Sequence, residues 1–182
     1  MNNKLKFTLK AWPLIAAATI GLCFLTQGVA KLFDINLPDQ HQVEVVRYVF
    51  MHAFDSARNF AITVTTLLQV LLIMPILEEF LFRWLLVMMP TRRLGMAAKM
   101  SAVPLVVFSS ALFSFAHYID YSSLVNGRGF ALTGWNAAFI ALFFFGLAQC
   151  WLYRKTERIW FPFLNHGLFN LTNLALLFVL PA

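Results

Sequence analysis

The sequence contains few charged residues and few cysteines. Only 12% of its 182 residues are charged and 60% are hydrophobic, whereas about 25% of a soluble domain is charged. This shortage of charge excludes an ordinary soluble domain and predicts an integral membrane protein. The two cysteines, Cys23 and Cys150, lie inside apolar runs as small hydrophobic residues, so no disulfide framework is expected.

The net charge of +6 does not indicate a nucleic-acid partner. The basic residues form short clusters beside apolar segments, as topology determinants do, at residues 4–10, 92–99 and 154–158. By the positive-inside rule, the N-terminus is expected in the cytoplasm and the C-terminus on the far side. The small size favours a bacterial inner-membrane protein whose partners are membrane lipids and a membrane-associated substrate.

Long apolar runs predict an all-α, polytopic transmembrane bundle of about five spans. These runs cover residues 11–33, 59–89, 102–118, 135–153 and 160–180. If the first were a cleaved signal peptide, which the small residues Gly28 and Ala30 permit, four spans would remain, although retention is favoured. The chain then divides into an N-terminal helix with an extramembrane loop, residues 1–58, and a helical core, residues 59–182.

Three charged residues, Glu78, Glu79 and Arg83, interrupt the second run. A charge at bilayer depth costs roughly 2.5–3.5 kcal/mol, so such residues are expected to line a polar cavity. Glu79 and Arg83 are four residues apart and can pair on one helix face. Adjacent residues of an α-helix point about 100° apart, so Glu78 and Glu79 are not expected to face the same neighbour. Glu78 is therefore the candidate base that takes a proton from water.

Two histidines also lie in apolar runs, each with a companion four residues away on the same helix face. Phe113 precedes His117, and Asn170 follows His166, with Asn173 extending that polar stripe. Counted from the basic boundaries at about 1.5 Å per residue, Glu78, His117 and His166 lie roughly 20, 27 and 12 Å deep. They converge only if the helices tilt, or kink at Pro75 or Pro104.

Three ordered segments, EEFLFR (78–83), FSFAH (113–117) and HGLFN (166–170), resemble the motifs EExxxR, FxxxH and HxxxN/D of a protease family. This is the CPBP family, also called Abi, of CAAX-protease-like and bacteriocin-processing intramembrane endopeptidases, which includes the Rce1-type proteases. The resemblance covers roughly residues 70–178. It implies that residues 59–182 form a CPBP-type catalytic core with its active site in an intramembrane cavity. Trp84 departs from the pattern, because many members have Gly there.

Transferred to these motifs, the family mechanism gives each residue a role. Glu78 would be the general base that activates water with His117, and His166 and Asn170 would support the oxyanion. Glu79 and Arg83 would be supporting residues, as would Phe113 and Asn173 on the shared helix faces. The mechanism requires no cofactor, and prenylated CAAX substrates are not implied.

Other interpretations remain open. Glu78, His117 and His166 match a catalytic zinc site in residue type, but no HExxH is present, so Zn²⁺ is the alternative cofactor and a zinc metalloprotease the alternative enzyme. A non-catalytic bacteriocin-immunity or scaffold protein could keep these residues for packing. A small proton-coupled transporter would use the Glu and His residues as a relay.

Overall fold

The computed structural model describes residues 3–37, 41–93, 98–120, 123 and 126–179, and within them the chain is almost entirely helical. One isolated bridge pairs Ile119 with Leu132 in the segment between α6 and α8. The helices are α1 (Asn3–Leu32), α2 (His41–Met51), α3 (Ala57–Leu68), η1 (Gln69–Ile73), α4 (Met74–Glu78), η2 (Glu79–Met88), α5 (Met89–Arg93), α6 (Ala98–Ala116), α8 (Ala138–Thr156) and α9 (Trp160–Val179). The predicted all-helical fold is confirmed.

Every predicted span corresponds to a helix or to a continuous helical segment. By length and composition, Asn3–Leu32 and Ala57–Arg93 are the two described helices able to cross a membrane, and Ala102–Ala116 is a shorter apolar helix. In α9 the apolar run is interrupted by the polar residues Asn165, His166, Asn170 and Asn173. Three of these four residues, His166, Asn170 and Asn173, are candidates that the sequence offers for chemistry.

The second span is one helical segment of 37 residues in which α-helical hydrogen bonding gives way to π-helical hydrogen bonding at two places. Its π-helical parts, η1 and η2, flank the short α4, which carries Pro75 at its start. The N–H of Met74 bonds to the carbonyl of Gln69, five residues back, and that of Met89 bonds to Trp84 in the same way. Pro75 has no N–H to donate, so the carbonyls one turn earlier need other partners.

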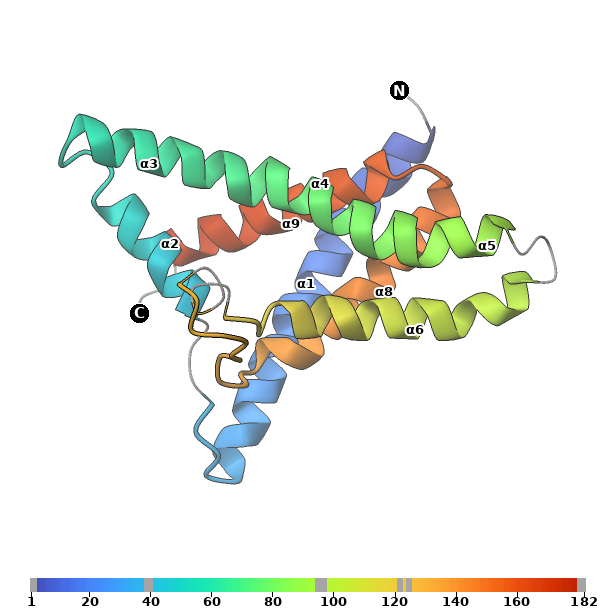
Figure 1. Ribbon diagram of the computed structural model, residues 1–182, viewed down its shortest axis with the longest axis horizontal. Coiled ribbons are helices and arrows are strands. Elements are labelled where there is room, and N and C mark those ends of the chain that lie inside the picture. Colours follow the sequence, from blue (N-terminus) through green and yellow to red (C-terminus); the bar gives the residue numbers. More distant parts are fainter. Residues whose placement is uncertain (1–2, 38–40, 94–97, 121–122, 124–125, 180–182) are drawn as a thin grey trace.

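The helices pack around a small aromatic core. Figure 1 shows the α3–α5 segment lying across one side of the molecule, with α6 below its C-terminal half and α1 crossing the other helices. The core consists of Ala16 of α1 with phenylalanines from η2, α6, α8 and α9, which are Phe82, Phe113, Phe145 and Phe169. Residues 1–58 thus contribute to the core through α1, while the domain boundary at residue 58 stays a prediction.

Two glycines allow unusually close contacts between helices. A Cβ on Gly146 of α8 would lie 3.0 Å from Cα of Ser110 in α6. A Cβ on Gly167 of α9 would lie 2.8 Å from the carbonyl oxygen of Leu71 in η1. The distance at Gly167 is shorter than real Cβ contacts, so the observed packing requires glycine there, whereas the distance at Gly146 is tighter than most real Cβ contacts and favours glycine. The second contact brings α9 against the segment that carries the glutamates.

The basic residues at the start of α1 lie close to those at the end of α8. Nζ of Lys4, near the start of α1, donates a hydrogen bond of 2.7 Å to the carbonyl of Thr156, the last residue of α8. The neighbouring Arg154 and Lys155 lie in the last turn of α8. This proximity agrees with the sequence pattern that assigned the two basic clusters to the same side of the membrane.

Candidate active site

The predicted site residues meet at one cavity of about 880 Å³. Its lining comes from α2, the α3–η2 segment, α6, α8 and α9, together with residues just after α6. Five residues named from the sequence line it, which are Glu78, His117, His166, Asn170 and Asn173. The different depths estimated along the helices therefore do not prevent convergence. The other three, Glu79, Arg83 and Phe113, lie behind this lining and are buried.

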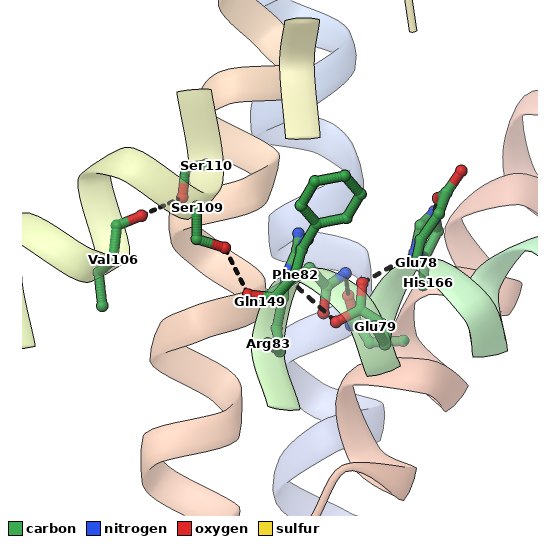
Figure 2. A network of polar contacts seen from close by, with 10 residues as sticks. Glu78, Glu79, Phe82, Arg83, Val106, Ser109, Ser110, Gln149 and His166 are labelled. Carbon is green, nitrogen blue, oxygen red and sulfur yellow. Dashed lines mark hydrogen bonds and ion pairs between the residues drawn. The ribbon is translucent and has the colours of Figure 1, made fainter. Parts of the chain in front are cut away.

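Glu79 links two cationic or potentially cationic side chains. Its Oε2 lies 3.2 Å from Nε of Arg83, which confirms the predicted pair four residues apart. Its Oε1 lies 2.9 Å from Nδ1 of His166 in α9, a contact that the sequence analysis did not predict. Figure 2 shows both contacts as dashed lines. Glu79 therefore holds the His166 ring in place while it compensates the charge of Arg83.

Glu78 contacts the same imidazole, contrary to our expectation that the two glutamates face different neighbours. Its Oε2 lies 3.5 Å from Nε2 of His166. The expectation was wrong because an imidazole has a nitrogen on each of two edges, so one ring can lie between two carboxylates. The segment also changes here from α-helical to π-helical, so the angular spacing of an α-helix does not apply.

Phe113 lies at the centre of the buried side of the site and is fully buried. Its ring packs edge-on against the rings of His117 and His166, with centroids 4.7 and 5.9 Å apart. The guanidinium carbon of Arg83 lies 4.3 Å from the centroid of the same ring. Its backbone carbonyl is 2.8 Å from Nδ1 of His117. A single residue thus contacts both histidines and the buried arginine.

The contact with Phe113 also defines the free nitrogen of His117. A carbonyl oxygen can only accept a hydrogen bond, so Nδ1 of His117 is the donor. In the neutral ring, Nε2 then carries the lone pair. His117 lies just beyond the end of α6 and lines the cavity. The backbone hydrogen bond therefore prepares Nε2 to accept a proton there.

Arg83 is 1% exposed, and its charge is compensated mainly from two sides. Glu79 provides the carboxylate, and the face of Phe113 provides a cation–π contact. Its Nη1 and Nη2 atoms have no hydrogen-bond partner among the described residues. Breaking a buried ion pair on one side leaves an uncompensated charge, so Arg83 depends strongly on Glu79.

Asn170 has an unexpected partner in the backbone of η1. Its Nδ2 donates a hydrogen bond of 2.8 Å to the carbonyl of Val70. In the i→i−5 register of η1, the donor to this carbonyl would be residue 75, which is a proline without an N–H. Asn170 therefore supplies the donor that Pro75 lacks. Nδ2 carries a second hydrogen that remains for the cavity.

A buried amide pair next to the site was not found by sequence reasoning. Nε2 of Gln149 in α8 lies 2.9 Å from Oδ1 of Asn165, the residue before His166, and both side chains are fully buried. Figure 2 places Gln149 in the same polar network as Arg83 and Glu79. The signal was available, because an amide in an apolar span is costly unless it is paired.

The geometry bears on the zinc alternative in two ways. Within the described residues, no group of three or more His, Cys, Asp or Glu side chains is placed to hold a metal ion. Nδ1 of His117 faces a backbone carbonyl and Nδ1 of His166 faces a carboxylate, which are contacts that metal-binding histidines also make through their second nitrogen. The choice between a metal-free site and a zinc site therefore stays a prediction.

The chain also matches a known protein family. A family model described as Type II CAAX prenyl endopeptidase Rce1-like matches residues 60–172. This range contains the glutamates, both cavity-lining histidines and Asn170, and it ends just before Asn173. Searches of curated proteins and of solved structures gave no match.

Proposed function

Because the chain belongs to the Rce1-like family of type II CAAX prenyl endopeptidases, we propose that its cavity is the active site of an endopeptidase of Glu/His type. The substrate is a membrane-associated protein or peptide, as the family implies. The observation that carries this proposal is the convergence of Glu78, His117, His166 and Asn170 on a single cavity in an integral membrane protein. They come from three separate segments, α4, the end of α6 and α9, which makes this arrangement unusual for residues that serve packing alone.

In the proposed reaction, Glu78 and His117 activate a water molecule between them. The side chain of Glu78 is 17% exposed and faces the cavity, and the neutral His117 presents Nε2 as an acceptor. Glu78 takes a proton as the water oxygen attacks the carbonyl carbon of the substrate. The tetrahedral intermediate then collapses, the C–N bond breaks, and protonated Glu78 gives its proton to the leaving amine.

His166 and Asn170 support the oxyanion in this proposal. One hydrogen on Nδ2 of Asn170 is donated to the carbonyl of Val70, and this bond fixes the direction of the other hydrogen. The contact between Nε2 of His166 and Glu78 is long, at 3.5 Å, so a substrate oxygen can take the place of Glu78 at Nε2. Because Nδ1 already donates to Glu79, Nε2 supports an oxyanion in the form of the ring that carries a proton on both nitrogens. Glu79 keeps the ring oriented through Nδ1 during this exchange, which makes it a positioning residue.

The proposed location is a bacterial inner membrane with the N-terminus in the cytoplasm. The alternation of basic clusters supports this orientation, as does the contact of Lys4 with the end of α8. Single cysteines placed at the two ends of α9 and labelled from outside intact cells test it. Labelling from outside is expected after α9 and not before it, and the reverse pattern would contradict the orientation.

The activity is tested by comparing membrane proteins from cells that carry the wild type, Glu78→Gln or His166→Ala at matched abundance. New protein N-termini are expected only with the wild type, and they identify the substrates. If all three give the same termini while each still rescues a phenotype, the protein is a non-catalytic immunity or scaffold protein. Proton-dependent flux in liposomes that contain the purified protein would instead support the transporter interpretation.

A further inference from the structure

Two amide side chains line the cavity and form no hydrogen bond with another of the residues that the structure describes. Gln69, at the start of η1, is exposed to the cavity, and Asn173 of α9 is half-buried. The hydrogen bonds found in the described part of the chain include neither side chain, in contrast to Asn170. An amide that faces an apolar, water-poor surface without a partner costs free energy. Their positions therefore favour a ligand with complementary hydrogen-bonding groups.

Two contacts show that these amides lie at a similar level of the cavity. Gly167 meets the carbonyl of Leu71, and Asn170, one turn later in α9, meets the carbonyl of Val70. A later residue of α9 thus contacts an earlier residue of η1, which means that the two segments run antiparallel. One further turn of α9 reaches Asn173, opposite the start of η1 and the end of α3. Gln69 lies there, together with Thr66, which also lines the cavity.

We propose that Gln69 and Asn173 bind the peptide backbone of the substrate a few residues away from the scissile bond; this rests on the proposed endopeptidase function. Each primary amide offers N–H donors and a carbonyl acceptor, which match the C=O and N–H groups of one peptide unit. The remaining cavity wall consists largely of apolar side chains, including Leu77, Leu81 and Leu174. Such a wall can pack against apolar side chains of the substrate, but it offers no hydrogen bonds to the peptide backbone. The two amides supply these hydrogen-bonding groups.

The distance along the helix defines which part of the substrate is bound. Gln69 precedes Glu78 by nine residues, which is at most about 13 Å along a helix axis. An extended peptide covers about 3.3 Å per residue, so this distance corresponds to roughly four substrate residues. The amides therefore hold the backbone on one side of the cleaved bond and select for an unwound segment, independently of its side chains.

The test measures the rate at which wild-type-specific N-termini appear in membranes of cells expressing Gln69→Met, Asn173→Leu, the double variant or Glu78→Gln. Each single variant is expected to slow every cleavage by about tenfold, and the double variant by about a hundredfold. The residues around the cleaved bonds should stay the same, because backbone recognition does not read sequence. Asn173→Gln retains an amide and should recover part of the rate.

Matched controls separate this inference from the proposed function and from misfolding. Gln27→Leu changes an amide in α1 outside the cavity and should behave as the wild type. Abundance and detergent unfolding temperature are measured for each variant, and Asn173→Gln and Gln69→Glu serve if an apolar variant does not accumulate. Unchanged cleavage, or a changed sequence preference, would overturn backbone binding. The absence of termini specific to the wild type would overturn the endopeptidase function itself.

Discussion

Oε1 of Glu79 lies 2.9 Å from Nδ1 of His166, although 87 residues separate them in the chain. The other oxygen of the same carboxylate contacts Arg83 in the next turn. Glu79 thus joins the second span to the last one at the level of the cavity, whereas Glu78 faces into the cavity. The adjacent glutamates have separate tasks because one is fully buried and the other is reached from the cavity.

We expect Glu79→Leu to destabilise the protein far more than Glu78→Gln. Removing the Glu79 carboxylate leaves the buried Arg83 uncompensated, which costs about 3–5 kcal/mol. Glu78→Gln should abolish cleavage and leave stability nearly unchanged, because Glu78 faces the cavity. Thermal unfolding in one detergent measures both effects. Equal unfolding temperatures for the two variants would contradict the buried role of Glu79.

Gly167→Ala should disturb the site through the backbone. The new Cβ would lie 2.8 Å from the carbonyl oxygen of Leu71, so α9 and η1 must separate. Such overpacking costs about 1–3 kcal/mol, and it shifts the neighbouring His166. Unfolding temperature and cleavage should both fall. Gly28→Ala is the matched control, since a Cβ there meets nothing within 4 Å, and it should have neither effect.

The cost of Asn170→Leu should depend on Pro75. In the wild-type background the substitution leaves the Val70 carbonyl without its donor, which costs about 1–3 kcal/mol. In a Pro75→Ala background the new N–H of residue 75 can donate to that carbonyl, so the cost should be smaller. A double-mutant cycle of unfolding free energies measures the difference. Additive costs would show that the two residues do not share this carbonyl.

The buried pair of Gln149 and Asn165 should also show non-additive costs. Gln149→Leu alone leaves the Asn165 amide buried without a partner, at about 1–3 kcal/mol. Replacing both residues with leucine removes both polar groups, so the double variant should lose less stability than the sum of the single variants. Unfolding free energies of all three variants test this expectation. A simple sum would indicate that each amide has other partners.

Cleavage should not require a bound metal ion. The proposed water activation uses the Glu78 carboxylate and Nε2 of His117, and the described residues form no cluster of three metal-ligating side chains. We therefore expect chelators to leave the rate of the purified protein unchanged, and elemental analysis to find less than one zinc per chain. Loss of activity on chelation with recovery on adding Zn²⁺ would establish the zinc alternative.

Much of the fold could be predicted from the sequence because few backbone conformations can cross a membrane. Apolar runs become helices when no water is present to satisfy the backbone, and polar residues inside them then need partners within the bundle. This reasoning led to Glu78, His117 and His166, which line one cavity despite their different estimated depths. Their chemical roles remain predictions, as does the domain boundary.

Other contacts between residues could not be predicted from a single sequence. The change from α- to π-helical hydrogen bonding around Pro75 alters which side chains share a face, so the angular spacing of an α-helix wrongly gave Glu78 and Glu79 different neighbours. The contact of Asn170 with a backbone carbonyl depends on that register as well. Gln149 could have been noted as an amide in an apolar run, but its partner Asn165 is known only from the packing of α8 on α9.

The exposed side of the cavity has a consequence for the surroundings of the protein. Leu77 and Leu81 line the cavity, and 55% and 44% of their surfaces are exposed. In a bilayer, acyl chains are the surroundings that suit such apolar surface, so lipid is expected to form part of the cavity wall. Chain length and unsaturation in the host membrane therefore become variables of the chemistry, and a detergent micelle provides a different chamber from a bilayer.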